Sequence, residues 1–563
     1  MNSLRNTIKD RLYIFVYAFL LGVILHAQAL FLRTDATDSI RAYGGTQAQP
    51  ASGRFIGYLL DGVFERLGFW QPYRFINVLF YLAFTAAGVL MLILIFGIRS
   101  RLISLLLASL VMSSAMNSGI LIYFYVAHMY GFVFLLSMLS AWLLLKTRAL
   151  LLPAALLVFS MGIYQAFLPT AVLVIFLYRL RELCGEEDVT AWLKRTAKDV
   201  YIVLASLLIY IALNRLFLRL SGLSMSGYAG MGENVLPGYG AAQLLRLIGK
   251  SYRLPFELMR GRRYFLGDHL PARLSIAVSC AALIAEFLLM LKTEAQPKKK
   301  ALLGLLMLLL PVMINLPMFM EEEIGERLSL NWYFLLMTPL ILADALLSSG
   351  TAAGFSASGA DPIVSERVPL LRTALSAVPV TAAIVMSLYS GYRNVSIYSS
   401  YEKCHDIAEN IVLDIEQRLG ACEDFSLNDE ILFMGTLHTE DVNQRFFNEE
   451  YGMFLYRLFN RDHASIMNRY AVHSYRFVTP DDARVRKLSL SESAALQPGA
   501  WYGAENGANA AGTGAGGWFC VRGIHSGFPA IHSLNSEVLQ MPSYPAAGCV
   551  RRVDGLIVVK LSD

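Results

Sequence analysis

The sequence predicts an α-helical polytopic membrane protein of about eleven spans, followed by a small extracytoplasmic α/β domain. Of its 563 residues, 56% are hydrophobic and 16% are charged, whereas soluble proteins average about 25% charged residues. The charge deficit lies in long apolar runs before residue 395, and the composition becomes polar near residue 393. We therefore expect a membrane domain over residues 1–395 and a C-terminal domain over residues 396–563.

Apolar runs of spanning length define the membrane domain. The first run contains Ala27-Gln28-Ala29, which resembles a signal-peptide cleavage site. The run continues past that point, so we expect an uncleaved first helix. The predicted spans cover residues 12–32, 75–98, 102–122, 126–145, 149–163, 166–178, 200–218, 274–291, 301–319, 332–348 and 371–392.

The charges of alternate loops predict the orientation, because cytoplasmic loops of membrane proteins collect Lys and Arg. With the N-terminus in the cytoplasm, every short inside loop is basic and the C-terminal domain lies outside. The basic residues of these loops are Arg99, Arg101, Lys146, Arg148, Arg179, Arg181, Lys194, Arg195, Lys198, Lys292, Lys298, Lys299, Lys300, Arg367 and Arg372.

Residues 149–178 decide this orientation, since about 30 residues must supply two crossings of normally 17–25 residues each. One long helix is the alternative, but it would move Lys298–Lys300 outside. We expect two short helices that meet at Gly162–Gln165. Short helices persist in lipid where protein covers their ends or where they line a watery cavity. Tyr164 and Gln165 are thus candidates to line an outer cavity, and a plain surface turn is the alternative.

The first outer loop, residues 33–74, carries two carboxylates directly after the first span, Asp35 and Asp38. Partial desolvation near the interface can raise a carboxylate pKa toward that of a general base. Ordinary helix-end charge is the other interpretation. Arg54 then opens an amphipathic helix that fits the plane of the interface, where its planar fork suits a lipid phosphate.

The second outer loop, residues 219–273, is basic, which opposes the usual charge bias and favours an anionic lipid headgroup as ligand. A solvated basic face is the alternative. Its residues Arg260, Arg262 and Arg263 are candidate phosphate ligands. We add His128, at the outer start of a span, and Arg327, which ends a short charged loop, to the candidate cavity. Glu286 and Asp344 lie in the inner halves of spans, where we expect structural hydrogen bonds.

The C-terminal domain should contain a helix over Tyr401–Leu419 and strands at Glu430–Met434, Trp518–Val521, Glu537–Leu539 and Leu556–Leu561. Asp554-Gly555 suits a tight hairpin turn, and the Gly/Ala-rich stretch 499–517 suits a loop. Cys404, Cys422, Cys520 and Cys549 permit disulfides outside the cytoplasm or are free thiols. The chain has no C-x-x-C pair, no phosphate-cradling glycine loop and no basic tract interleaved with aromatics. These absences argue against a zinc site, a nucleotide and a nucleic acid partner.

Several short motifs resemble a known family. They are Thr37-Asp38-Ser39-Ile40, Ser52-Gly53-Arg54-Phe55, Gly162-Ile163-Tyr164-Gln165-Ala166, Met541-Pro542-Ser543-Tyr544-Pro545 with Gly548, and Val558-Val559-Lys560-Leu561-Ser562. With the order of loops and spans, they resemble the O-antigen glucosyltransferase II family, within the C-type superfamily of polytopic membrane glycosyltransferases. Phe55 stands where Trp is expected, and Asp35 and Asp38 are separated where the family pattern has adjacent acids. The second departure leaves the catalytic carboxylate open.

The resemblance implies transfer of glucose or a related hexose from a polyprenyl-phosphate carrier to an extracytoplasmic surface glycan in a bacterial inner membrane. It implies Asp38 as the first choice of base and Asp35 as the second, with no cofactor and no metal. Arg54, Arg260, Arg262 and Arg263 would hold the leaving phosphate. Expected partners are the bilayer, a flippase and a donor-lipid synthase. A lipid-linked sugar flippase or polysaccharide transporter is the main alternative, and a membrane-anchored glycan-binding or assembly protein is the other.

Overall fold

The computed structural model describes residues 2–35, 39, 50–68, 73–147, 149–185, 188–224, 240–260, 269–294, 296–319, 326–348, 362–422, 425–435, 437, 463–478, 485–487, 518–522, 529–533 and 535–561. The chain forms two compact units. The membrane unit comprises residues 1–31 and 44–398, and the C-terminal unit comprises residues 32–43 and 399–563. The division near residue 398 lies close to the expected one. The expected membrane domain differs in that residues 32–43 group with the C-terminal unit.

Every apolar segment that the sequence predicts as a span is helical. Five described helices are long and apolar enough to cross a membrane, namely Arg74–Phe96, Arg101–Leu121, Phe124–Lys146, Val189–Leu220 and Leu270–Lys292. The chain is thus mostly helical with several membrane-spanning segments, and the count of eleven stays a prediction. The described α-helices up to residue 420 are α1 (Asn2–Leu25), α2 (Ala27–Phe31), α4 (Phe55–Arg66), α5 (Arg74–Phe96), α6 (Arg101–Ser113), α7 (Ala115–Leu121), α8 (Phe124–Lys146), α9 (Leu151–Ile163), α10 (Leu168–Gly185), α11 (Val189–Leu220), α12 (Ala241–Met259), α14 (Leu270–Thr293), α15 (Pro297–Ile314), α16 (Leu330–Ser348) and α17 (Pro362–Gly420).

Residues 149–178 form two helices that run in opposite directions, not one long helix. The hydroxyl of Ser140, late in α8, donates to the Pro153 carbonyl at the start of α9 (2.8 Å). The ring of Tyr164, just after α9, stacks on Tyr130 near the start of α8, with centroids 4.0 Å apart. Lys146 Nζ, at the end of α8, then donates to Tyr178 in α10 (3.1 Å). α9 is therefore antiparallel to α8, and α10 is parallel to α8.

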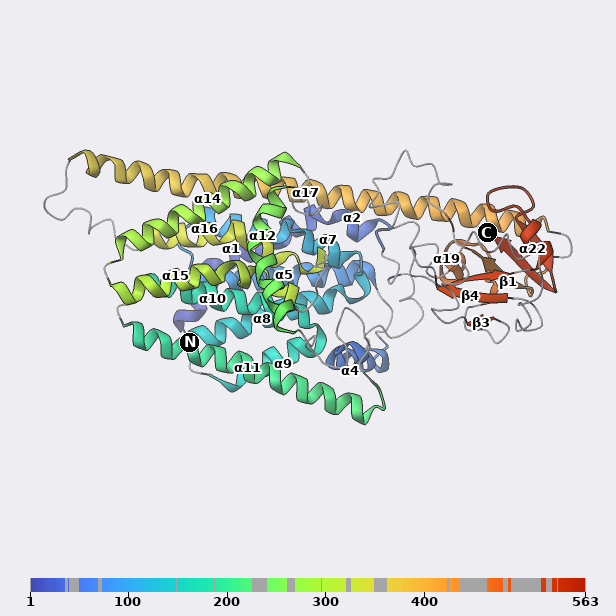
Figure 1. Ribbon diagram of the computed structural model, residues 1–563, viewed down its shortest axis with the longest axis horizontal. Coiled ribbons are helices and arrows are strands. Elements are labelled where there is room, and N and C mark those ends of the chain that lie inside the picture. Colours follow the sequence, from blue (N-terminus) through green and yellow to red (C-terminus); the bar gives the residue numbers. More distant parts are fainter. Residues whose placement is uncertain are drawn as a thin grey trace. The chain divides into compact units, whose positions relative to one another are not determined.

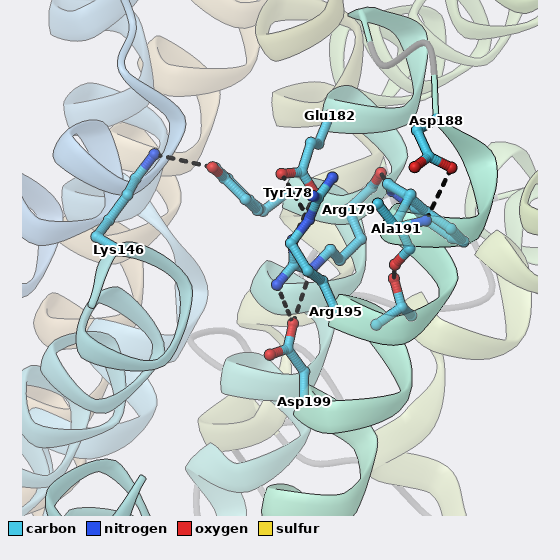
Figure 2. A network of polar contacts seen from close by, with 10 residues as sticks. Lys146, Tyr178, Arg179, Glu182, Asp188, Ala191, Arg195 and Asp199 are labelled. Carbon is cyan, nitrogen blue, oxygen red and sulfur yellow. Dashed lines mark hydrogen bonds and ion pairs between the residues drawn. The ribbon is translucent and has the colours of Figure 1, made fainter. Parts of the chain in front are cut away.

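Ion pairs join the helix ends at which the basic loops meet, which we call the basic end (Figure 2). Arg179 of α10 donates to Asp199 of α11 (Nε to Oδ2, 2.7 Å) and pairs with Glu182. Asp188 caps α11 by accepting from the backbone N–H of Thr190 and Ala191. The Arg179–Asp199 pair is buried, so loss of either partner would leave an uncompensated charge. These contacts fix α10 and α11 together at one end.

The two ionisable residues predicted to lie in the inner halves of spans have different surroundings. Asp344 accepts from the backbone N–H of Ser100 (3.0 Å) and pairs with Arg181 (3.3 Å), so it joins α16, α6 and α10. This is the structural contact expected for Asp344. The carboxylate of Glu286 is fully buried in α14 and has no hydrogen-bond partner among the described residues.

The predicted span 102–122 is broken at Ser114, between α6 and α7. A break frees backbone groups, which must find partners inside the protein because lipid offers none. Asn117 Nδ2 donates to the Val111 and Met112 carbonyls, and Asn394 Nδ2 donates to the Ser113 carbonyl. His26 Nε2 also lies 2.9 Å from the Met112 carbonyl. Side chains from α7, from α17 and from the junction between α1 and α2 therefore replace the lost helical bonds.

Helix α12 crosses the other helices of the membrane unit in place of running along them (Figure 1). Tyr252 donates from its hydroxyl to the Leu308 carbonyl of α15 (2.6 Å), and Asn315 donates to Ser251 (3.3 Å). Part of the predicted second outer loop, residues 219–273, thus forms a helix that packs against α15. Leu244, Leu245 and other large apolar side chains of α12 stay exposed, as a surface facing lipid requires.

The C-terminal unit is an α/β layer structure. Its described strands are β1 (Glu430–Met434), β2 (Arg476–Phe477), β3 (Arg486–Lys487), β4 (Trp518–Arg522), β5 (Pro529–Ser533), β6 (Val550–Val553) and β7 (Leu556–Lys560). The sheet order is β3-β4-β5-β1-β7-β6, with β2 also pairing β1. β1 and β7 are parallel, and β6 and β7 form the predicted hairpin, with Asp554 and Gly555 at positive φ. The small α/β sheet expected at the C-terminus is present.

Both faces of the central strands are buried, as expected for parallel strands. Ile431, Phe433 and Val559 pack against the end of α17 and against α19 (His463–Tyr470). Leu432 and Val558 face the opposite side with Val538 of α22 (Ser536–Gln540). The predicted strand Glu537–Leu539 is wrong: Asn535 caps a helix there by accepting from the Glu537 N–H (2.9 Å). The predicted helix Tyr401–Leu419 is the last part of α17, which continues without a break from the last apolar segment.

The buried Lys560 links the two closing motifs of the chain. Its Nζ donates to the carbonyls of Val538, Leu539 and Met541, at 3.3, 3.1 and 2.8 Å. These carbonyls end α22 and lack helical partners of their own. The amino group is therefore satisfied although its side chain is buried.

Of the four cysteines that could be paired in disulfides or free, Cys404, Cys422 and Cys549 are free thiols. The side chain of Cys520 lies outside the described residues. Burial raises the pKa of the Cys404 thiol to about 12. A thiol that stays protonated is a poor nucleophile, so we assign Cys404 to the core of the C-terminal unit.

Glu416, near the end of α17, holds the segment that follows α19. It accepts from the Tyr475 hydroxyl (2.7 Å) and from the backbone N–H of Val472 and His473. Burial acts to raise the pKa of Glu416, but these hydrogen bonds outweigh it and lower the pKa from 4.5 to about 2. Because the pKa of Glu416 is lower in the folded state than in the unfolded state, the ionised carboxylate stabilises the fold above pH 4.5. This stabilisation is lost as the pH falls from 4.5 to about 2.

We predict that Glu416→Gln lowers the free energy of unfolding of the C-terminal unit at pH 7 by roughly 1.5–3 kcal/mol, the range for a hydrogen bond to a charged group. The difference between wild type and variant should shrink as the pH falls from 4.5 to about 2, because the carboxylate becomes protonated first in the unfolded state and then in the folded state. Urea unfolding followed by circular dichroism at pH 7, 4 and 2 measures this. Glu537→Gln, at an exposed position, is the control and should change little. A constant difference at all three pH values would contradict the assignment.

Candidate functional site

The candidate site in the membrane unit is built where two of the sequence motifs dock. Gln165 Nε2, from the turn after α9, donates to the Ser52 carbonyl (2.8 Å) and to the Tyr210 hydroxyl (2.8 Å). That hydroxyl in turn donates to the Gly53 carbonyl (3.0 Å). Gln165 is buried, and these two bonds use both hydrogens of its amide group, so neither hydrogen is left without an acceptor. The outer-loop motif is thereby fixed to the turn between the two short helices.

Two glycines allow this close approach. A Cβ atom on Gly53 would lie 2.4 Å from Gln165 Nε2 and 2.5 Å from the Tyr210 hydroxyl. Gly53 also has φ of +82°, which side chains disfavour. A Cβ atom on Gly162 would lie 2.5 Å from the side chain of Ile56. The glycines at 53 and 162 are therefore required by contact between the motifs.

Arg54 follows Gly53 and lies against aromatic rings. Its guanidinium carbon is 5.0 Å from the centre of the Tyr164 ring, and its Nη1 donates to the Tyr130 hydroxyl (3.3 Å). The Tyr130 and Tyr164 rings stack on each other. A guanidinium over an aromatic face gains roughly 0.5–2 kcal/mol, more as it is desolvated. The rings thus hold the planar fork of Arg54 in place.

Arg54 also stands at the N-cap of α4, the helix Phe55–Arg66. A helix N-terminus carries a partial positive charge and favours anions, as does the guanidinium itself. Phe55 anchors this end, because it is buried against Tyr210 and Phe217 with ring centroids 6.2 and 5.7 Å apart. The site can therefore bind an oxyanion such as phosphate.

The structure brings together three of the residues singled out in the sequence, Arg54, Tyr164 and Gln165. His128 lies partly buried in α8, two residues before Tyr130. Arg327 stacks over the ring of Tyr123, just before α8, at 4.7 Å. Arg260 is exposed at the end of α12, and Arg262 and Arg263 lie outside the described residues.

The two carboxylates of the first outer loop are placed differently. Asp38 lies outside the described residues. Asp35 belongs to the C-terminal unit, where its side chain is fully buried and forms an ion pair with Arg469 of α19. Its backbone carbonyl accepts from His405 Nε2 (2.9 Å). The carboxylate of Asp35 is buried and paired with Arg469, which fits a structural role.

Sequence reasoning missed Tyr130 and Tyr210, which complete the site. A signal for Tyr210 exists in α11, where Ser206, Tyr210 and Asn214 follow one another at intervals of four residues. All three are buried, while most of α11 faces outward. A polar stripe at helical spacing on an apolar helix points to a packed polar face. No comparable polar stripe at intervals of four residues distinguishes Tyr130, since Val126 and Phe134 stand four residues before and after it.

The described features define a protein with several membrane-spanning segments, in which Arg54 stands at the N-cap of α4 against two stacked tyrosine rings. The sequence model of the family described as glucosyl transferase GtrII matches residues 28–343. This range covers more than half of the chain, so the chain belongs to the glucosyl transferase GtrII family, and the resemblance found in the sequence is confirmed. Membership supports a membrane glycosyltransferase of glucose over the flippase alternative. No curated protein and no solved structure matches the chain.

We predict that Gly53→Ala lowers glucose transfer at least about tenfold, because the new methyl group would push apart Gln165 and Tyr210 and misplace Arg54. Transfer of labelled glucose to the cell-surface glycan in membranes measures the effect. Gly68→Ala is the matched control: Gly68 has a similar φ of +78°, but a Cβ atom there meets nothing within 4 Å. Equal losses in both variants would mean that backbone strain, and not the motif contact, causes the defect.

Proposed function

We propose that the chain transfers glucose from a polyprenyl-phosphate carrier to an extracytoplasmic surface glycan. The observation that carries this proposal is Arg54, which the docked motifs hold at the N-terminus of α4 beside Tyr164. A planar guanidinium binds two phosphate oxygens at once. Family membership supplies the sugar, and the arginine supplies a reason for a phosphate-linked donor.

The proposed reaction is a direct displacement at the anomeric carbon of the donor. The acceptor hydroxyl oxygen forms a bond to this carbon while the bond from the carbon to the phosphate oxygen breaks. The hydroxyl proton passes to a carboxylate, for which we propose Asp38. Arg54, with Arg260, Arg262 and Arg263, stabilises the negative charge that develops on the leaving polyprenyl phosphate. Fixed cations can neutralise a monophosphate, so we propose no metal and no cofactor.

The burial of Asp35 supports Asp38 as the base. A base must come within hydrogen-bonding distance of the acceptor hydroxyl, and Asp35 is fully buried and already paired with Arg469. Asp38 follows three positions later in the same loop. We therefore propose a structural role for Asp35 and the catalytic role for Asp38.

We further propose that the basic end faces the cytoplasm of a bacterial inner membrane, which puts the C-terminal unit outside. The concentration of Lys and Arg at that end supports this orientation. A polyprenyl-phosphate sugar made inside must cross the bilayer to reach an outer site. A donor-lipid synthase and a flippase are therefore the partners that this reaction requires.

We predict that Arg54→Ala lowers kcat/KM for polyprenyl-phosphate glucose by about 10- to 150-fold, which corresponds to roughly 1.5–3 kcal/mol for hydrogen bonds to a charged group. Arg54→Lys should recover part of this loss, because it keeps the charge without the planar fork. Initial rates at varied donor concentration in membranes give the constants. Arg66→Ala, at the exposed far end of α4, is the control and should stay within about twofold of wild type. An unchanged kcat/KM in Arg54→Ala would remove the phosphate assignment.

The function itself is tested by Asp38→Asn, which should reduce glucosylation of the surface glycan at least about 100-fold, the usual contribution of a general base. Protein amount in the membrane and resistance to mild proteolysis should stay unchanged. Mass spectrometry of the glycan, with and without the gene and with each variant, measures the product. Near-normal glucosylation in both Asp38→Asn and Asp35→Asn would exclude the first outer loop as the source of the base.

A further inference from the structure

The first residues of the predicted first outer loop contact side chains of the C-terminal unit. Residues 32–43 belong to the same compact unit as residues 399–563, although residues 44–398 separate them in the chain. Thr34, Asp35 and Ser39 are each at most 1% exposed. A segment of a loop that is this deeply buried has specific partners, and the structure identifies them.

Asp35 is held through both its side chain and its backbone. The carboxylate pairs with Arg469, the penultimate residue of α19, and this pair is largely shielded from solvent. The carbonyl of Asp35 accepts from His405 Nε2 at 2.9 Å. A nitrogen that donates to a carbonyl carries a proton, so the tautomer of His405 is fixed by this contact.

Tyr470 connects these partners into one cluster. Its hydroxyl hydrogen-bonds His405 Nδ1, and its ring lies 5.6 Å from the guanidinium carbon of Arg469. The guanidinium carbon of Arg33 lies 5.8 Å from the same ring, and Arg33 pairs with Glu409, one helical turn after His405. We call Arg33, Asp35, His405, Glu409, Arg469 and Tyr470 the loop clamp.

The members of the loop clamp do not contribute equally. Arg33 and Glu409 are substantially exposed, and such surface pairs contribute little to stability. The Asp35–Arg469 pair is buried, and a buried pair is an inefficient way to gain stability but an effective way to fix one arrangement. Arg469 and His405 are therefore the residues whose loss should release the loop.

We propose that Arg469 and His405 are positioning residues. By binding Asp35, they hold one flank of the segment that contains Asp38, and the C-terminal domain is thereby part of the catalytic apparatus. The proposal rests on the proposed function, because it matters for catalysis only if Asp38 is the base. It adds a role for the C-terminal domain, most of which lies beyond the residues that the family match covers.

The test uses the full-length protein in membranes with labelled polyprenyl-phosphate glucose. In Arg469→Ala, kcat should fall at least about tenfold while KM for the donor stays within about twofold, since misplacement of a catalytic group slows the chemical step. Arg469→Lys should restore part of kcat by restoring the ion pair. Arg552→Ala is the matched control, because it breaks another ion pair of the same unit, with Asp429 (2.6 Å), and should leave kcat unchanged.

A second measurement reports the loop directly. With Ser39→Cys as a reporter at a buried position, labelling by a membrane-impermeant maleimide should become at least about fivefold faster in Arg469→Ala, but not in Arg552→Ala, because release of a local contact exposes the segment. Should Arg469→Ala fail to fold, His405→Ala provides the test, since it removes the hydrogen bonds to the Asp35 carbonyl and to the Tyr470 hydroxyl but leaves the Asp35–Arg469 ion pair in place.

The outcomes separate the two proposals. Unchanged labelling at position 39 and unchanged kcat in folded Arg469→Ala and His405→Ala would overturn the loop clamp. A raised KM with unchanged kcat would also overturn it, because it would place Arg469 in donor binding. Full activity of Asp38→Asn together with faster labelling in Arg469→Ala would instead remove the base assignment and leave the clamp as a structural contact.

Discussion

The membrane unit depends on how the chain satisfies its polar groups at the turn between α9 and α10. Lipid provides no hydrogen bonds, so a turn between two short helices persists only if the protein supplies them. The buried Gln165 does this by donating to the Ser52 carbonyl and to Tyr210. The bond to Ser52, and the bond from Tyr210 to the Gly53 carbonyl, fix the Ser52–Gly53 motif, which Arg54 follows directly. One requirement of the bilayer thus determines where Arg54 stands.

Helix α10 carries this constraint from one end of the membrane unit to the other. Near its start, Thr170 donates to Asn331 of α16 (2.7 Å). Near its end, Arg179 and Arg181 bind Asp199 and Asp344, and Cys184 contacts Met290 of α14. The contacts are polar at both ends, where helices leave the apolar interior. These contacts fix the position of α10 along its axis and its rotation about that axis relative to α11, α14 and α16.

Sequence patterns predicted the parts of this structure that depend on local composition. Apolar runs located the helices, loop charges required the reversal at Tyr164, and the Asp-Gly pair located the β6–β7 turn. The contacts of Asp35 with Arg469, and of Arg54 with Tyr130, join residues far apart in the chain and have no local pattern. The segment Glu537–Leu539 was predicted as a strand, but the Asn535 cap favours a helix there. Local signals thus defined elements and single candidates, while long-range packing defined the site.

The contact between Gly162 and Ile56 has a consequence for how such a chain can change over evolutionary time. A methyl group at position 162 would overlap the Ile56 side chain, and one at position 53 would overlap Gln165 and Tyr210. Neither motif can accept a larger residue unless its counterpart becomes smaller in the same lineage. Substitutions in the two motifs should therefore be inherited as compensating pairs, and the pairing of position 56 with position 162 would be readable as covariation among related sequences.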